Sequence, residues 1–265
     1  MKASNVKYMS VPTHGNYHGY YLKRPFVDDP RLALLPKDTF KDKKVLDIGC
    51  NEGWVTCEIA QNWGAHKVVG VDIDDLLVRA AWKRRQMVWS MQKPHDPASD
   101  LKTSQKQLDY FPTSLQHSFG PLPIPSSSEA EDKHVFPHNV SFRTADWTKE
   151  DILEDKDGYD VIVAFSISKW IHANGGDEGL RAFFRRVYSV LSPGGTFILE
   201  PQEWETYKKV RRMNESLRTS IQSLELRPSD FESILGSLGF SPARHAGTAG
   251  EGGFSRAVDI YVKAG

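Results

Sequence analysis

Short runs of β-branched and apolar residues alternate along this chain with longer segments of helical periodicity. Such alternation is typical of a parallel sheet covered by helices on both faces. The runs predict strands over residues 44–48, 67–71, 140–144, 160–165, 196–200 and 257–262. The periodic segments predict helices over residues 53–62, 74–91, 178–191 and 228–238. The sequence therefore predicts an α/β fold, and we expect one domain over residues 1–265.

The part of the chain at about residues 93–137 breaks this alternation. Proline and serine dominate there, as in PLPIPSSSEAEDK, and no helical or strand period is sustained. We expect a flexible insertion that leaves the sheet undisturbed, because it falls between a helix and a strand.

The charge balance excludes a general attraction to polyanions, because the chain has 34 basic and 34 acidic residues and a pI of about 7.1. A nucleic acid must therefore meet a local basic patch. The two cysteines, Cys50 and Cys57, suit neither a disulfide framework nor a metal site, so we expect reduced thiols, no bound metal and an intracellular protein. We also expect neither export nor a membrane anchor, because no apolar run reaches the roughly eighteen residues of a span.

The stretch VLDIGCNEGW, residues 45–54, passes from an apolar strand through a glycine turn into a helix, which suggests a nucleotide site. A dinucleotide site needs G-x-G-x-x-G, but Asn51 and Trp54 replace the second and third glycines and would fill the space of a pyrophosphate. A G-K-[ST] phosphate loop is also missing after this strand. What remains is Asp47 at the end of the first strand and Asp72 at the end of the second, where a carboxylate can accept both hydrogen bonds of a ribose diol.

These features resemble the S-adenosylmethionine site of class I methyltransferases. The resemblance implies a Rossmann-like, mostly parallel sheet of seven strands with helices on both faces. It also implies that Asp146 accepts a hydrogen bond from the adenine amine, that Trp147 stacks on the base, and that Phe165 lies beneath the adenine or methionine moiety. Alone, Asp72 or Asp146 would serve equally well as a helix N-cap, so the argument depends on several features in register at successive strand ends.

Longer blocks extend the resemblance over most of the chain outside the insertion and the C-terminal residues. They are GNYHGYYLKRP, VLDIGCNEGWVT, GVDID, VFPHNV, SKWIHANGGDEGLRAFFRRVYSVLSPGG and LEPQEWETYKK. Together they resemble the Bicoid-interacting-protein family of RNA methylphosphate capping enzymes. The resemblance implies methyl transfer from S-adenosylmethionine to the 5′-terminal phosphate, typically the γ-phosphate, of a small noncoding RNA. It also implies a nuclear monomer, with the cytoplasm as a further location, and ribonucleoprotein proteins as further partners.

The residues agree with phosphate methylation. A phosphate oxygen is already anionic near neutral pH, so no general base is needed, and catalysis consists of holding that oxygen about 3 Å from the sulfonium methyl and compensating its charge. Cationic and hydroxyl donors suit this task. Matching to the family gives three catalytic candidates on the phosphate side: Tyr20, Arg24 and Lys169. It gives the following candidates on the cofactor side: Tyr21, Arg31, Asp47, Gly49, Cys50, Asn51, Asp72, Ile73, Asp146, Trp147 and Phe165.

Four further residues are candidates for RNA contact. Trp170 and His172 would stack on or contact the first nucleotide, and Lys208 and Lys209 belong to a basic cluster that continues to Arg212. Each has a structural alternative: the two rings would also serve to pack a helix start, and basic runs are commonly solvated helix faces.

Two other functions stay open at this point. One is methylation of a small molecule or protein, although the N-P-P-[YF] motif of amino-group methylases is missing at the end of the fourth strand. The other is an RNA-binding scaffold without turnover, against which the intact set of Asp47, Gly49, Asp72 and Lys169 argues.

Overall fold

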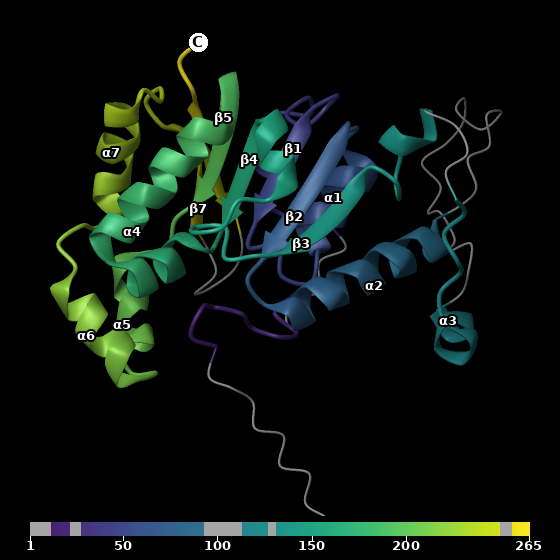
Figure 1. Cartoon of the computed structure of the whole chain (residues 1–265), viewed down its shortest axis with the longest axis horizontal. Coiled ribbons are helices and arrows are strands. Elements are labelled where there is room, and N and C mark those ends of the chain that lie inside the picture. The colour runs from purple at the N-terminus through teal and green to yellow at the C-terminus, as the bar shows by residue number, and fades with distance from the viewer. Residues whose placement is uncertain (1–11, 22–27, 93–112, 127–130, 250–255) are drawn as a thin grey trace, which may run out of the picture.

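The computed structural model describes residues 12–21, 28–92, 113–126, 131–249 and 256–265, and Figure 1 shows a central sheet with helices around it. The sheet has seven strands in the order β3-β2-β1-β4-β5-β7-β6. Their bounds are β1 Lys44–Ile48, β2 Lys67–Asp72, β3 Val140–Thr144, β4 Tyr159–Phe165, β5 Leu191–Glu200, β6 Arg244–Ala249 and β7 Arg256–Val262. Strands β3, β2, β1, β4 and β5 are parallel, whereas β7 and β6 are antiparallel to their neighbours. This confirms the predicted seven-stranded, mostly parallel Rossmann-like sheet.

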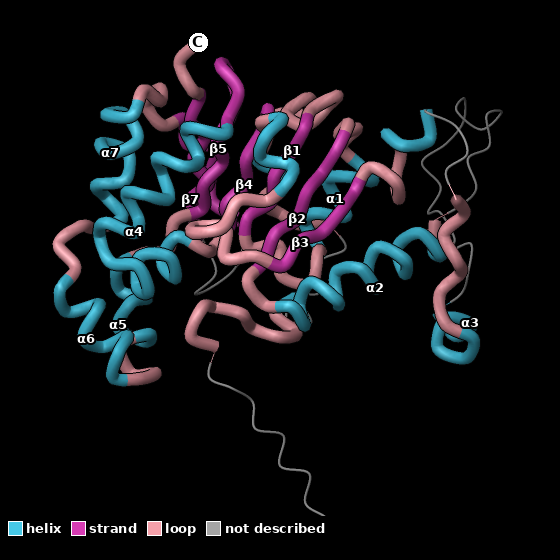
Figure 2. Tube along the Cα trace, viewed as in Figure 1, coloured by secondary structure: helices cyan, strands magenta, loops and turns pink. Residues whose placement is uncertain are grey.

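The α-helices are α1 Trp54–Asn62, α2 Asp75–Met91, α3 Thr113–Phe119, α4 Ser168–Val190, α5 Tyr207–Val210, α6 Glu215–Ser223 and α7 Phe231–Leu238. Short 3-10 helices are η2 Leu32–Leu34, η3 Glu131–His134, η4 Leu153–Asp157, η5 Trp204–Thr206 and η6 Pro228–Asp230. In Figure 2 the strands form one layer, with α4, α5, α6 and α7 gathered near β5 and α2 running beside β3. No helix in the described residues is long and apolar enough to span a bilayer.

Two hydrophobic cores lie on opposite faces of the sheet because successive strand residues point to opposite faces. Val45 packs into the core that α1 and α2 cover, together with Ile59 and Val78. Leu46, the next residue, packs into the core that α4 and α7 cover, which includes Phe184. The sheet is therefore buried on both faces, and its carboxyl and amino edges are the places where polar side chains collect.

All six predicted strands are present, although β5 begins five residues before its predicted start, and β6 was not predicted. It forms because Arg244–Ala249 pairs with β7, with a register shift between His245 and Gly247. Helices α5 and α6 were also not predicted. Helix α4 begins ten residues before its predicted start, and Gly176 interrupts its helical geometry with φ 67° and ψ −173°.

The described part of the insertion contains structure that the sequence did not predict. Helix α3 lies in it, although the sequence sustains no helical period there. The segment after α3 contacts the last turns of α2: the Leu122 backbone N–H donates to the Ser90 hydroxyl at 2.7 Å, and the Gln86 amide donates to the Leu122 carbonyl at 3.3 Å. Residues 93–112 and 127–130 lie outside the described residues.

Candidate active site

The carboxyl ends of β1, β2, β4 and β5 lie along one edge of the sheet because these strands are parallel. We call this the carboxyl edge. Ligands of open α/β sheets bind outside this edge, where the strand order reverses. Here the strand order reverses between β1 and β4, which predicts a binding site at the turns that follow these two strands.

The turn after β1 requires glycine for two separate reasons. Gly49 has φ +77°, which side chains rarely allow, and a Cβ there would lie 2.2 Å from Cγ2 of Ile167. Gly53, which begins α1 in a left-handed conformation, would bring a Cβ within 2.9 Å of Ala81 and Phe142. The backbone of this turn is therefore tightly packed between the β4–α4 turn and helix α2.

Asp72 joins the ends of β1 and β2. Its carboxylate accepts the backbone N–H groups of Asn51 at 2.9 Å and of Asp74 at 3.0 Å. Burial raises the pKa of Asp72, although these hydrogen bonds oppose the shift. Beside it, the side-chain oxygen of Asn51 is buried without a hydrogen-bond partner in the described structure. A buried acceptor without a donor is costly, so this position fits a ligand that brings donors, as a ribose diol does.

Asp47 lies deeper, at the end of β1. It is 3% exposed, accepts the Thr56 hydroxyl at 2.6 Å, and has its pKa raised by burial to about 6. Next to the turn, Cys50 is also buried, which raises the pKa of its thiol. Asp47 and Cys50 thus support the turn from inside the protein, whereas Ile73 is 37% exposed at the carboxyl edge.

Arg31 is a buried cation whose donors already have partners. Its guanidinium donates to Asp29 at 2.6 and 2.8 Å, to Glu200 at 2.9 Å and to the Tyr21 hydroxyl at 3.0 Å. Its carbon Cζ lies 4.5 Å from the ring centroid of Phe165. Arg31 thus connects the end of β4 with the end of β5. A ligand anion at this guanidinium would share it with these partners.

Two adjacent tyrosines approach the carboxyl edge beside Arg31. Tyr21 stacks on Trp54 with ring centroids 5.5 Å apart, and Tyr20 contacts Tyr21 edge-on at 5.1 Å. Burial raises the pKa of Tyr21, so its hydroxyl stays protonated near neutral pH. Arg24, the catalytic candidate that follows them, lies outside the described residues.

The segment of residues 12–21 crosses the carboxyl edge and is fixed at several points. The Asn51 amide donates to the Tyr17 carbonyl at 3.2 Å, and the Glu52 carboxylate accepts the Gly19 backbone N–H at 2.9 Å. At its other end the segment meets α4, where the Asn174 amide donates to the Thr13 carbonyl at 2.9 Å. The segment therefore bridges the turn after β1 and the start of α4.

Asp146 and Trp147 follow β3, and their side chains point in different directions. The Asp146 carboxylate accepts the Thr148 hydroxyl at 2.5 Å and pairs with Lys149 at 2.8 Å. The Trp147 ring is 2% exposed, and its indole N–H donates to Asp155 at 3.2 Å. In this arrangement Trp147 is enclosed in the protein, whereas Asp146 remains half-buried near the surface.

Lys169, in the first turn of α4, is a buried ammonium without a carboxylate partner in the described residues. It is 8% exposed, and its Nζ lies 3.3 Å from the Thr206 hydroxyl and 5.2 Å from the ring centroid of Trp170. Burial, together with the positive charges of Arg256 and Lys209, lowers the pKa of Lys169 to about 8. An anion placed beside this ammonium would stabilise its charged form.

The other RNA candidates divide into buried and exposed residues. Trp170 is 7% exposed and contacts Tyr17 edge-on at 5.9 Å. His172 is fully buried, with its ring nitrogens bonded to the Tyr207 hydroxyl at 3.1 Å and to Asp177 at 2.7 Å, so no face of this ring is open to a nucleotide here. Lys208 and Lys209, by contrast, are exposed on α5.

Sequence reasoning assigned no role to three residues that contact the β4–α4 turn. Glu200 is 1% exposed and accepts the Ser166 hydroxyl at 2.6 Å as well as Arg31. Arg256, at the start of β7, donates to the same Ser166 hydroxyl at 2.6 Å. The third is Gln202, which bonds to the β4–α4 turn. Glu200 and Gln202 belong to the block LEPQEWETYKK, whose resemblance to the family marks them as candidates. Their positions in the sequence do not show which residues they contact.

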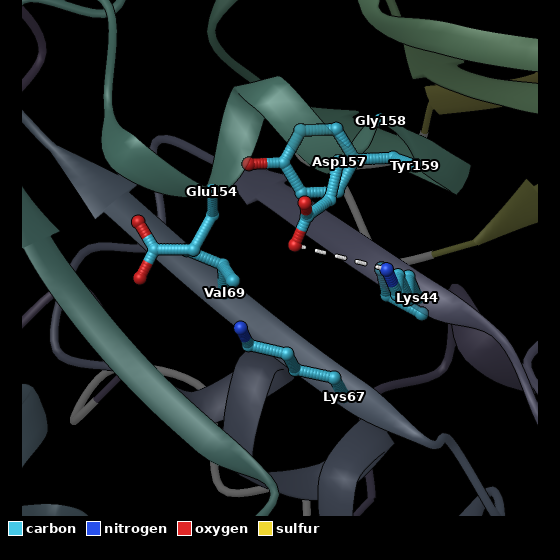
Figure 3. Close-up of a pocket in the computed structure, with 8 residues that line it drawn as sticks. Lys44, Lys67, Val69, Glu154, Asp157, Gly158 and Tyr159 are labelled. Carbon is cyan, nitrogen blue, oxygen red and sulfur yellow. Dashed lines mark ion pairs between the residues drawn. The ribbon is translucent and has the colours of Figure 1, made fainter.

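A small hollow lies at the opposite, amino edge of the sheet. Figure 3 shows Lys44, Lys67 and Tyr159, from the starts of three strands, around it, with Lys44 and Asp157 paired at 3.9 Å. The Glu154 carboxylate on its rim pairs with Arg143 at 2.5 Å. The two carboxylates of this hollow, Asp157 and Glu154, thus have cationic partners within the protein. The described residues contain no group of three or more metal-ligating side chains.

The strand order, the glycine turn and Asp72 together define a class I methyltransferase fold. Two family models match: "Methyltransferase domain" over residues 45–121 and "Bicoid-interacting protein 3 (Bin3)" over residues 159–263. A solved magnesium protoporphyrin IX methyltransferase from Synechocystis, with bound SAM, superposes with a TM-score of 0.52 at 17% identity, covering 88% of this chain and 76% of that one. This likeness supports the fold.

Two relatives are similar to this chain over most of its length, and the first is also matched over most of its own. The U6 snRNA methylphosphate capping enzyme Amus of Drosophila melanogaster is 32% identical over 94% of this chain and 74% of its own length. The human 7SK snRNA methylphosphate capping enzyme is 36% identical over 95% of this chain, but the match spans only 39% of its length. The chain belongs to the Bicoid-interacting protein 3 family.

Proposed function

We propose that this protein transfers a methyl group from S-adenosylmethionine to the 5′-terminal phosphate, typically the γ-phosphate, of a small noncoding RNA. The observation that carries the proposal is Lys169, a buried ammonium at the carboxyl edge without a carboxylate partner in the described residues. A terminal phosphate would supply the missing negative charge.

On the cofactor side, Asp72 and Asn51 would hold the ribose, and Asp146 would accept from the adenine amine. Bound S-adenosylmethionine supplies an electrophilic methyl on a sulfonium. The Gly49 turn lets the backbone approach the cofactor closely, and Ile73 and Phe165 would border its base and methionine ends. Cys50 and Asp47 would keep the turn in shape. Trp147 would support the adenine end from within the core, and Arg31 and Tyr21 would lie near the methionine end.

On the phosphate side, the chain has to orient an oxygen that is already anionic. Lys169 would compensate its charge, Tyr20 would donate a hydroxyl hydrogen bond, and Arg24 would grip two oxygens as a bidentate donor. No general base is required, so the pH dependence should follow Lys169 and the phosphate itself. Trp170 and His172 would shape the end of this site, and Lys208 and Lys209 would attract the following phosphates.

The relatives support the acceptor class, since two of them are named for methylphosphate capping of different small nuclear RNAs. We also propose a nuclear location, because the RNAs in these names are small nuclear RNAs, and ribonucleoprotein proteins as further partners. We further propose that residues 1–265 act as one monomeric domain. The same fold would also serve methylation of a small molecule or a protein, but a buried ammonium beside exposed lysines favours an acceptor that carries several negative charges.

The test offers labelled S-adenosylmethionine and RNAs with 5′-triphosphate, monophosphate or hydroxyl ends. We expect label on the triphosphate RNA, less on the monophosphate RNA and none on the hydroxyl RNA. Lys169→Met should abolish most transfer, whereas Lys156→Met, an exposed lysine of η4, should not. Equal label on all three ends would contradict phosphate methylation, and RNA binding without transfer would indicate a scaffold.

A further inference from the structure

The turn that joins β4 to α4 has an unfavourable backbone conformation. Ser166, immediately after β4, has φ +60° although it is not glycine. Such residues persist only where their surroundings fix them, and they concentrate at functional sites. Lys169 follows three residues later, so the direction of its side chain depends on this turn.

Gln202 makes the contacts that fix the turn. Its side chain is 2% exposed, and its oxygen accepts the Lys169 backbone N–H at 3.0 Å and the Ser168 hydroxyl at 3.1 Å. Its amide nitrogen donates to the Ser166 carbonyl. One amide thus bonds to the turn at three points, using acceptor and donor together. An ionised carboxylate lacks the donor, and a thioether lacks both at comparable strength.

We infer that Gln202 is a positioning residue for phosphate methylation, acting through Lys169 by holding the β4–α4 turn. The inference rests on the proposed function and adds to it a residue that does not touch RNA. Within the described residues, all of its side-chain bonds go to the turn, and it follows β5, which two strands separate from β2 and Asp72. Gln202 should therefore affect the use of RNA and leave cofactor binding unchanged.

The first test compares Gln202→Met with wild type. A misplacement of about 1 Å costs about 100-fold in rate, so we expect kcat/KM for 5′-triphosphate RNA to fall by about that factor. The Kd of S-adenosylmethionine, measured by calorimetry, should stay within about twofold. Gln222→Met, on the exposed face of α6, is the matched control and should change neither quantity. Equal losses of RNA use and cofactor binding in Gln202→Met would overturn the inference.

The variant Gln202→Glu distinguishes the loss of the hydrogen bonds to the turn from a general loss of structure. The protonated carboxyl repeats the donor and the acceptors of glutamine, whereas the ionised form loses the donor to the Ser166 carbonyl. Burial raises the pKa of a carboxyl. Relative to wild type, the activity of Gln202→Glu should therefore be highest at low pH and should decline as the carboxyl ionises, while Gln202→Met stays low throughout. A constant ratio of Gln202→Glu to wild type across pH would count against positioning.

A double variant tests whether the effect passes through Lys169. Lys169→Met combined with Gln202→Met should be no slower than Lys169→Met alone, because a positioning residue has no effect without the group it positions. Additive losses would show that Gln202 acts elsewhere and would overturn the inference.

A measurement without RNA keeps this inference distinct from the proposed function. Acylation of Lys169 by acetic anhydride, followed by peptide mass spectrometry across pH, should have a midpoint near 8 in wild type. In Gln202→Met the midpoint should move toward that of an ordinary lysine. If wild type methylates no RNA, the proposed function fails, and the midpoint still decides whether Gln202 positions Lys169. An unchanged midpoint would overturn the inference.

Discussion

Asn51 donates its backbone N–H to the Asp72 carboxylate at 2.9 Å, which fastens the turn after β1 to the end of β2. The second oxygen of this carboxylate accepts the Asp74 N–H at 3.0 Å. Each carboxylate oxygen has two acceptor sites, so Asp72 can still receive hydrogen bonds from a diol. One buried carboxylate therefore shapes the turn, and we propose that the same group binds the ribose of the cofactor.

Asp72→Asn should weaken S-adenosylmethionine binding by about 10- to 100-fold, or about 1.4 to 2.7 kcal/mol. The amide would turn an NH₂ group toward one of the two backbone N–H donors and would lose an acceptor for the ribose. Calorimetric titration measures the change. Asp75→Asn, an exposed neighbour paired with Arg79, should bind the cofactor like wild type. Equal affinities of both variants would contradict the role of Asp72.

The pKa of Lys169, lowered to about 8, predicts a pH limit for RNA use. Below pH 8 the ammonium is charged and attracts phosphate, and above it the charge is lost. The kcat/KM for triphosphate RNA should therefore fall as the pH rises through about 8, while the Kd of the cofactor changes little. Lys169→Arg should remove this limb of the profile, because a guanidinium stays charged. If kcat/KM still declines above pH 8 in Lys169→Arg, the decline must come from another titrating group.

The same group predicts a trend in stability with the opposite sign. An unfolded lysine has a pKa of about 10.4, so between pH 8 and 10 the unfolded chain binds more protons than the folded chain. The charged form costs stability below pH 8, and this cost is relieved as the pH rises toward 10, by on the order of 2–3 kcal/mol. Urea unfolding should show wild type gaining stability relative to Lys169→Met across this range. A constant difference would mean that Lys169 is not destabilised by burial.

Gly49→Ala should lower the melting temperature and remove cofactor binding. Its φ of +77° strains any side chain, and the new Cβ would lie 2.2 Å from Ile167. Gly179→Ala is the control: it lies inside α4 with open space around its Cβ, so it should stabilise the protein by about 0.5–1 kcal/mol. Calorimetry measures the change in melting temperature of each variant, which should be negative for Gly49→Ala and positive for Gly179→Ala. A stabilised Gly49→Ala protein would refute the turn geometry.

Lys208→Ala with Lys209→Ala should weaken RNA binding without changing the Kd of the cofactor. Each phosphate contact contributes about 0.7 to the slope of log K against log salt for a single strand, so the slope should flatten by about 1.4. Lys41→Ala with Lys43→Ala, exposed near the amino edge, is the matched control. If the slope flattens equally in the control, the attraction of RNA is not specific to the two lysines of α5.

The strands and the glycine turn were predictable because their signals are local. Burial on both faces gives β1 its apolar run, and a left-handed turn demands Gly49. Strand β6 was not predictable, since only pairing with β7 makes a strand from glycine-containing sequence. The start of α4 was missed because its glycines hide the helical period.

Residue types at strand ends identified candidates such as Asp47 and Asp72, but not the network behind them. Arg31 and Glu200 lie 169 positions apart in sequence, so no spacing reveals their contact. The directions of the Trp147 and His172 rings likewise depend on packing against residues elsewhere in the chain. The sequence therefore supplied the candidates at the carboxyl edge, and tertiary structure was needed to see which of them are enclosed.

Helix α2 separates the insertion from the candidate site at the carboxyl edge. It begins next to Asp74 at the carboxyl edge, and its 17 residues extend about 25 Å to the end where the Leu122 segment rests on Ser90. The chain returns there as well, since Arg85 donates to the Pro137 carbonyl at 2.7 Å. Changes in the length or sequence of the insertion should therefore leave the side chains of the carboxyl edge in place. A dye or an affinity tag can be attached in the insertion for the same reason.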